Sequence, residues 1–211
     1  MKYLNNIELV SQSEKLLEEY KLRKSARRYS EKDVPLEVIK NCIEVAGSSP
    51  SGANMQPWTF VVVRDKEIKR RIREESEKVE MDFYTKESTE EWRNDVKQFS
   101  TNYIKPFIEE APYLICIFAK KYDFNDDGSI KKHYYVRESV GISAGFLISS
   151  FHLLGLSCLV YSPSPNNFLS DILNRPENET PYFILAVGYP KEDIEIPKRE
   201  KKKLEEIMIL K

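Results

Sequence analysis

The chain has 211 residues, of which 41% are hydrophobic and 32% are charged. This is enough to bury the core of one domain of ordinary size beneath a charged surface. The formal net charge is −1, so the sequence lacks the basic field that nucleic-acid binding requires. We therefore expect a single domain over residues 1–211 and no nucleic-acid partner.

The cysteines and histidines do not follow a metal-binding pattern. Cys42, Cys116 and Cys158 lie in apolar runs without CxxC spacing, and His133 and His152 are the only histidines. We predict no metal site, and we expect buried free thiols in a reducing cytosol.

One uncharged stretch, residues 139–160, is long enough to cross a bilayer. Gly155 follows its helical pattern, however, and the run LSCLVYSP after it is typical of a strand. We interpret the stretch as a buried helix followed by a strand. The N-terminus also lacks the apolar core of a secretory signal, so we expect a soluble, cytoplasmic protein.

Helical and strand signals alternate along the chain. The predicted helical segments cover residues 10–22, 30–47, 66–110, 133–154 and 168–174. The predicted strands cover residues 58–65, 112–120, 156–163 and 182–190. Residues 48–57 and 122–129 have the composition of loops, and a break near 85–89 divides the third helical segment. This order of elements predicts an α+β domain built in α/β layers.

A basic turn, Arg-Lys-Ser-Ala-Arg-Arg, occupies residues 23–28 between two predicted helices. Guanidinium groups present paired donors that match a phosphate, and Ser25 adds a hydroxyl donor. A solvated surface turn would have the same composition, because charge runs usually lie on the surface.

The loop after the second helix offers a different kind of contact. Gly52 and Ala53 allow backbone amides to approach a flat ring closely, while Ser51 and Asn54 offer directional hydrogen bonds. The alternative is an ordinary connection between helix and strand, with Trp58 in the core. The two interpretations are compatible.

The R-x-S-x-R turn, the P-S-x-x-N-x-Q-P-W loop and the TFVVV strand together resemble the nitroreductase superfamily. That resemblance implies a nitroreductase-like fold, in which helices flank a central mixed, mostly antiparallel sheet, and an FMN cofactor. It places the FMN phosphate and ribityl chain at the basic turn, where Lys24 stands in place of the more common arginine. The FMN contacts that it implies in the turn and the loop are Arg23, Lys24, Ser25, Arg27, Pro50, Ser51, Gly52 and Asn54.

Later segments continue the resemblance. Val160, Tyr161 and Ser162 resemble the strand end beside the flavin, and the Ser162 hydroxyl, our candidate catalytic group, would donate to flavin N5. Lys201 falls where relatives place an arginine on the FMN phosphate. The helix within 133–154 resembles the one that packs against its twin in the family's dimers. With the apolar end of the chain, it implies a homodimer, domain-swapped through a C-terminal extension at residues 190–211.

Residues 74–110 resemble the helical active-site lid of the iodotyrosine deiodinase branch. Glu80 and Tyr84 are four residues apart, so a helix places both on one face, and Lys105 follows on the next helix. In that branch, Glu, Tyr and Lys at this spacing clamp the zwitterion of the substrate, and the Ala53 amide would meet its phenolate oxygen. Chance is the alternative, because Glu and Lys are abundant in this segment.

The resemblance implies FMN-dependent reductive dehalogenation of halotyrosines, which converts 3-iodotyrosine to tyrosine and iodide through one-electron flavin steps. Tyrosine itself is a second expected ligand. One alternative is a broad NAD(P)H-dependent nitroreductase, and another is a non-catalytic protein that binds flavin and tyrosine. The sequence names no electron donor, because no nicotinamide fingerprint is present.

Overall fold

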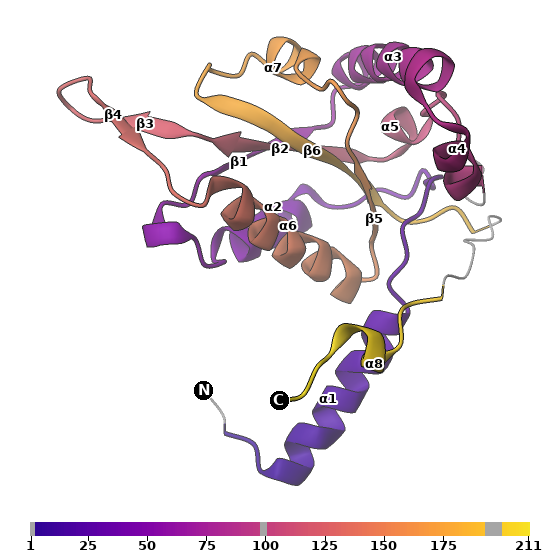
Figure 1. Ribbon diagram of the computed structural model, residues 1–211, viewed down its shortest axis with the longest axis vertical. Helices are drawn as coiled ribbons and strands as arrows, with labels where there is room; N and C mark the ends of the chain where they lie inside the picture. The colour runs from indigo at the N-terminus through magenta and orange to yellow at the C-terminus, as the bar shows by residue number, and fades with distance from the viewer. Residues whose placement is uncertain (1–2, 98–100, 193–199) are drawn as a thin grey trace.

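The structure, a computed structural model, describes residues 3–97, 101–192 and 200–211. Its centre is a four-stranded sheet in the spatial order β1-β2-β6-β5 (Figure 1). The strands are β1 (Trp58–Val63), β2 (Tyr113–Lys120), β5 (Ser157–Tyr161) and β6 (Glu179–Gly188). All three pairings in this sheet are antiparallel, so among the described strands the expected mixed character is absent.

Helices cover both faces of the sheet (Figure 1). On one face, α2 (Leu36–Gly47) and α6 (Val136–Leu153) bury Ile39, Leu147 and Phe151 completely. On the other face lie α3 (Lys66–Asp82), the short α5 (Phe107–Glu110) and α7 (Phe168–Ile172). Each large apolar side chain buried this way contributes about 1.5–3 kcal/mol to folding, so the packing of both helical layers on the sheet stabilises the core.

The predicted lid divides where its sequence indicated a break. The helix α3 passes into a π-helical turn, η2 (Phe83–Glu87), which is followed by α4 (Glu90–Lys97). The α4 helix lies at one side of the molecule, close to the end of α3 (Figure 1). Such π turns occur often at functional sites.

In the segment predicted as a loop, residues 125–129 form a turn as predicted, but residues 122–124 form a strand, so that part of the prediction was wrong. Two short strands, β3 (Tyr122–Phe124) and β4 (Ile130–Lys132), pair antiparallel around a turn at Gly128. His133 fixes the base of this hairpin through contacts of 2.9 Å with the Lys120 carbonyl and the Asp123 carboxylate. Strands this short and polar lack the apolar alternation that would have indicated them.

The uncharged stretch forms a helix and a strand, as predicted. The helix α6 ends before Gly155, whose φ of +74° turns the chain into β5. Among the described residues, no helix is long and apolar enough to cross a membrane. The three cysteines, Cys42, Cys116 and Cys158, are buried free thiols, as expected.

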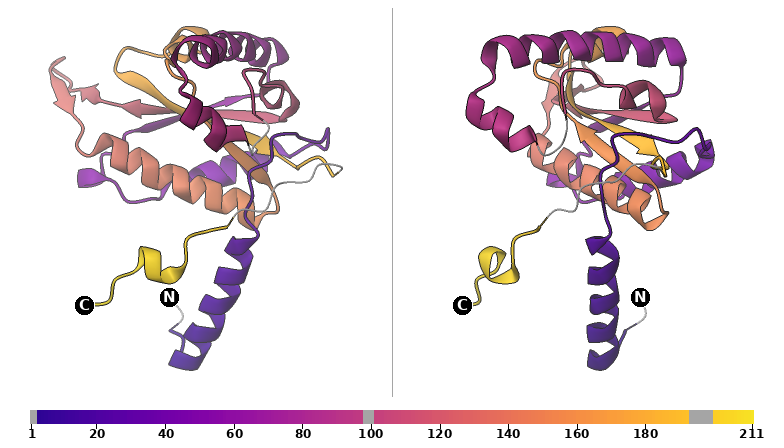
Figure 2. Two further views of the ribbon diagram at one scale, coloured as in Figure 1. Left: turned by 45° about the vertical axis from the view of Figure 1, so that its right-hand side comes forward. Right: turned by 90° about the vertical axis from the view of Figure 1, so that its right-hand side faces the viewer.

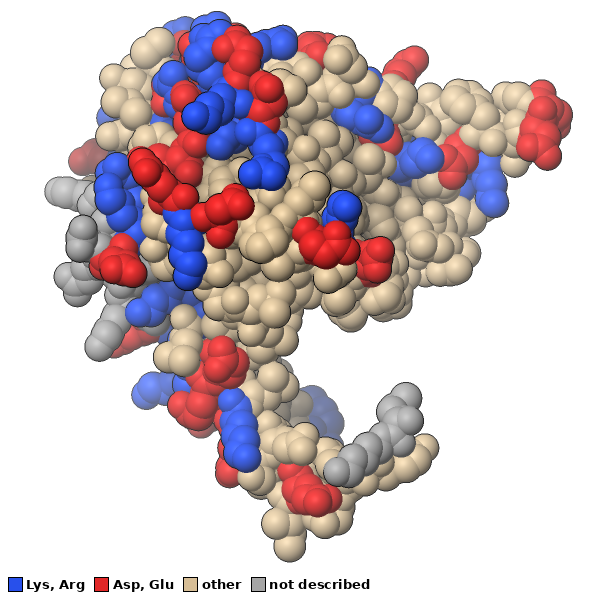
Figure 3. Space-filling view, turned by 180° about the vertical axis from the view of Figure 1, so that it is seen from behind, with Lys and Arg blue, Asp and Glu red and all other residues tan. Residues whose placement is uncertain are grey.

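Both ends of the chain project from the body. The helix α1 (Asn6–Lys21) begins earlier than its apolar period indicated, because Asn5 and Glu8 form a capping box. With α8 (Leu204–Ile207) it extends away from the sheet (Figure 2). In the space-filling view, the hollow beside this projection is lined mainly by uncharged side chains (Figure 3). No residue of α1 is buried within this chain.

Candidate active site

The carboxylate and ammonium groups of the predicted clamp meet. Lys105 Nζ lies 3.0 Å from Glu80 Oε2, with 6% and 16% of the two side chains exposed. Glu80 comes from the last turn of α3, and Lys105 from the segment just before α5. Lys105 also donates to the Asn102 carbonyl. A buried pair of opposite charges is stable only while both partners are present, so the two groups satisfy one another in the ligand-free chain.

Tyr84 completes the predicted triad from the π-helical turn. Its ring centroid lies 5.7 Å from Lys105 Nζ, and it packs edge-on against Phe83 and Trp92. Burial raises the pKa of its hydroxyl, a hydrogen bond with Thr101 opposes the shift, and the negative charge of Glu80 adds to it. Tyr84 therefore remains a neutral donor at physiological pH.

The strand end at residues 160–162 contributes two different surfaces. Val160 and Ser162 are exposed, whereas the Tyr161 side chain is buried in the opposite direction. The centroid of the Tyr161 ring lies 5.8 Å from Lys105 Nζ, and the ring packs edge-on against Phe107. Burial and the charge of Glu80 raise the Tyr161 pKa well above its usual value. Side chains alternate along a strand, so the Tyr161 ring faces the core beside Lys105 while Val160 and Ser162 face outward.

The basic turn is fixed against the start of β5. Ser157 Oγ accepts a hydrogen bond from the Ala26 N–H at 2.9 Å and donates to the Lys24 carbonyl at 3.1 Å. Arg23 donates from Nη1 to Ser25 Oγ at 3.4 Å. Lys24 is exposed, and Arg23, Ser25 and Arg27 are half-buried. The turn thus presents cationic side chains on an anchored backbone, the arrangement that a phosphate requires.

The Pro50–Asn54 part of the loop has an unusual backbone. Ala53, Asn54 and Gln56 all have positive φ angles, of 50°, 55° and 49°, a conformation that costs energy for residues other than glycine. A Cβ on Gly52 would lie 2.8 Å from the Tyr135 ring, so no larger residue fits there. Ser51 accepts from the Gln56 N–H within the loop, while Pro50, Ala53 and Asn54 are exposed.

The structure does not bring this loop to the clamp within one chain. The Gly52 N–H donates to Ser139 in the first turn of α6. The end of α1, which leads into the basic turn, contacts Ser149 and His152 in the last turns of α6. An 18-residue helix is about 27 Å long. The loop accordingly lies at the far side of the molecule from α4 and the basic turn (Figures 1 and 2).

The C-terminal contact stays a prediction. Lys201 is exposed in the tail between α8 and residues 193–199, which lie outside the described part of the chain. Of the predicted 190–211 extension, the structure describes residues 190–192 and 200–211, and the latter contain α8.

Sequence reasoning missed two residues of α3 behind the clamp. Glu77 Oε1 accepts from the Lys105 N–H at 2.8 Å, and its Oε2 accepts from Arg73 Nη1 at 2.7 Å. In a helix so rich in Glu, no sequence signal separates Glu77 from its solvent-exposed neighbours.

A layered antiparallel fold carrying a basic turn, a strained small-residue loop and a charged helical lid defines one class of protein. A sequence model of the Nitroreductase family matches residues 20–189. The chain belongs to that family.

Its relatives include several proteins named iodotyrosine deiodinase. The chain is 45% identical to the one from Haliscomenobacter hydrossis, with 96% of this chain and 91% of the relative aligned. It is 43% identical to the one from Nematostella vectensis, over 97% of this chain and 78% of that one. These matches cover the clamp and the basic turn alike.

Solved structures share the fold. One is an oxidized iodotyrosine deiodinase bound to FMN and 3-iodo-L-tyrosine, with a TM-score of 0.80 and 31% identity over 93% of this chain and 97% of that one. A BluB-like flavoprotein from Clostridium difficile has a TM-score of 0.70 at 23% identity, over 92% of this chain and 98% of that one. The second likeness concerns the fold alone.

Proposed function

We propose that this chain is a flavin-dependent oxidoreductase that removes halide from halotyrosines with FMN as its cofactor. The reaction on 3-iodotyrosine consumes two electrons and one proton and yields tyrosine and iodide. The observation that carries the proposal is the buried Glu80–Lys105 pair beside Tyr84. Named relatives with the same activity support it.

The clamp suits a free amino acid. An α-ammonium can replace Lys105 as the partner of Glu80, and an α-carboxylate can replace Glu80 as the partner of Lys105. One ion pair then becomes two, and neither buried charge loses its partner. Tyr84 can cover the ring from the adjacent turn, so residues 74–110 act as a lid that closes on an intact zwitterion and excludes water.

The residues of the chain also fit FMN. The half-buried Arg23 and Arg27, with Lys24 and the Ser25 hydroxyl, form a donor set for its phosphate. Close packing of Gly52 against Tyr135 fixes the loop in place, and the exposed Ala53 and Asn54 beside it can meet a flat ring. When bound, FMN supplies the electrons for the reaction.

Ser162 is the residue we assign to control of electron transfer. It is exposed just beyond β5, next to the buried Tyr161, so its hydroxyl can donate to a ring nitrogen of the cofactor at the strand end. Lys201 is a further phosphate donor in the same assignment.

A complete site on this account needs two copies of the chain. The basic turn and the clamp lie far from the Ala53 amide that would hold the phenolate oxygen, so the loop of one protomer would serve the clamp of its partner (Figure 1). Exposed apolar side chains that a second copy would cover are Ile7, Val10, Leu17, Ile142, Phe146, Ile207, Ile209 and Leu210. Patches of this kind mark interfaces, and exchange of the C-terminal tails would bury them.

The test compares ligands with and without the zwitterion. FMN-loaded protein should bind 3-iodotyrosine more tightly than 2-iodophenol by about 2 kcal/mol or more, because only the amino acid engages both buried charges. Titration of the bound-flavin fluorescence measures both affinities. Equal affinities, together with rapid NADPH-dependent reduction of a nitroaromatic, would favour a broad nitroreductase instead.

A further inference from the structure

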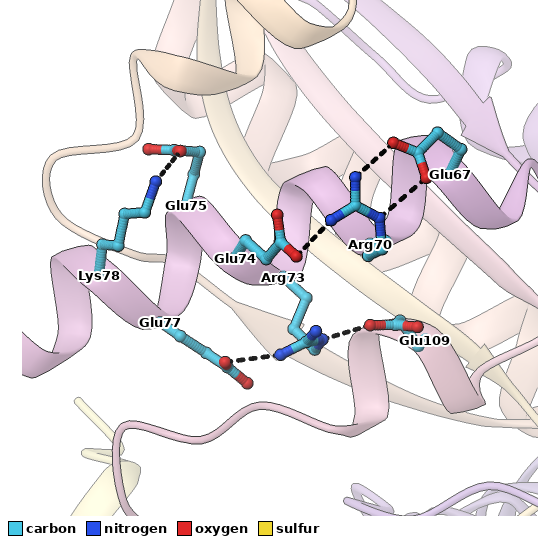
Figure 4. A network of polar contacts seen from close by, with 8 residues as sticks. All are labelled: Glu67, Arg70, Arg73, Glu74, Glu75, Glu77, Lys78 and Glu109. Atoms are coloured by element: carbon cyan, nitrogen blue, oxygen red, sulfur yellow. Dashed lines mark hydrogen bonds and ion pairs between the residues drawn. The ribbon is translucent and has the colours of Figure 1, made fainter.

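Further charged side chains on α3 lie behind the clamp and contact it through Lys105. Arg73 bridges two carboxylates, Glu77 on its own helix and Glu109 on α5, and we refer to these three residues as the Arg73 bridge (Figure 4). Glu77 has 19% of its side chain exposed and Arg73 has 28%, so this pair is more buried than the α3 ion pairs of Arg70 and Lys78. Among those others, Arg70 pairs with Glu74 on the same helix without reaching the clamp segment.

The bridge holds the backbone of the clamp lysine. One oxygen of Glu77 accepts a hydrogen bond from Arg73 at 2.7 Å, and the other accepts one from the Lys105 N–H at 2.8 Å. Glu80 lies three residues further along α3, and its carboxylate pairs with the Lys105 ammonium. One helix face therefore grips Lys105 at both ends, by its main chain and by its side chain.

A second set of hydrogen bonds joins the segment that carries Lys105 to α3. Lys69 donates from Nζ to the carbonyls of Glu109 and Ala111, at 2.9 and 2.7 Å, and so fastens the end of α5 to α3. Residues between Asn102 and α5 form no regular structure of their own. The position of the Lys105 backbone is thus set by the contacts to α3.

We propose that Glu77 and Arg73 are positioning residues that place Lys105 for the substrate carboxylate without touching the substrate. This inference rests on the proposed function, which assigns Lys105 to the carboxylate of the substrate. A long lysine side chain has many rotamers, so fixing its main chain reduces the ordering that binding must supply.

The test uses three variants of the FMN-loaded, full-length protein. Glu77→Ala removes both contacts, whereas Glu77→Gln keeps an oxygen for the Lys105 N–H and loses the negative charge. Glu74→Ala is the matched control, since it breaks an ion pair of the same spacing on the same helix. We expect Glu77→Ala to weaken 3-iodotyrosine binding on the order of tenfold. Glu77→Gln should stay within about threefold of wild type, and Glu74→Ala should bind as wild type.

Each other outcome overturns the proposal. Equal losses in Glu77→Ala and Glu77→Gln would mean that charge, not position, governs binding. Equal losses in Glu74→Ala would indicate a general effect on helix stability. Wild-type affinity in Glu77→Ala would remove the role altogether.

A ligand-free measurement separates this inference from the proposed function. Amide hydrogen exchange over residues 101–107 should be faster in Glu77→Ala than in wild type and Glu74→Ala, whether or not any halotyrosine binds. If the wild-type flavoprotein fails to bind 3-iodotyrosine, the proposed function fails. If exchange over this segment is unchanged, the positioning role fails.

Discussion

Lys105 Nζ and Glu80 Oε2 lie 3.0 Å apart between two helical segments, and both side chains are mostly buried. Neither charge reaches bulk water freely, so each depends on the other when no ligand is present. An amino-acid zwitterion is the small molecule that can separate the pair and leave both charges satisfied. In the proposed function, the lid would therefore bind the ammonium and the carboxylate of the substrate as well as its ring.

Removal of either charge should weaken halotyrosine binding and leave the cofactor in place. In Lys105→Ala or Glu80→Gln, the remaining partner is buried and unpaired, so we expect a loss of about 2 kcal/mol or more. Fluorescence titration of the FMN-loaded variants with 3-iodotyrosine measures it. Lys78→Ala, which removes an exposed lysine of the same helix, is the control. Unchanged affinity in both clamp variants would refute the clamp.

Loss of the Ser162 hydroxyl should separate two activities. Ser162→Ala removes the donor assigned to the flavin ring, so halide release from 3-iodotyrosine should slow by roughly tenfold or more. Halotyrosine binding should persist, and nitroaromatic reduction should change far less. Ser162→Thr, which keeps the hydroxyl, should behave nearly as wild type. The assignment fails if Ser162→Ala slows both reactions equally.

Charging the apolar tail should dissociate the proposed dimer. Ile209 and Leu210 are 81% and 89% exposed in the single chain, and burying such side chains is worth about 1.5–3 kcal/mol each. We expect the double variant Ile209→Glu, Leu210→Glu to run as a monomer by light scattering and to lose FMN affinity. Ile130→Glu on the hairpin is the control for added charge. A wild-type protein that is already monomeric with full FMN binding would contradict the two-chain site.

The cysteines should be inert in the native protein. Burial raises the pKa of Cys116 to about 12 and that of Cys158 to about 11, and it also raises the pKa of Cys42. A raised pKa keeps a thiol protonated below that value, so little thiolate exists at pH 8. Ellman's reagent should therefore detect almost no thiol until denaturant is added. Rapid reaction of even one thiol in the folded protein would show that its surroundings open.

The sequence predicted most of the layered core because its strands are apolar runs between turn residues. It also predicted the convergence of Glu80, Tyr84 and Lys105, since helical spacing sets two of them and the resemblance supplied the third. It missed Glu77, because a hydrogen bond that a carboxylate accepts from a backbone amide leaves no periodic signal. It also could not show that the loop at Gly52 and the clamp lie apart, because that separation depends on how α6 is placed in the folded chain, with the loop at its first turn and the end of α1 at its last turns.

The most direct test is anaerobic reduction of the FMN-loaded protein by dithionite in the presence of 3-iodotyrosine, with iodide and tyrosine measured together. We predict equimolar release of both products, and strong loss of release in the Lys105→Ala variant at subsaturating substrate. A fully reduced, 3-iodotyrosine-bound protein that releases neither product would contradict the account.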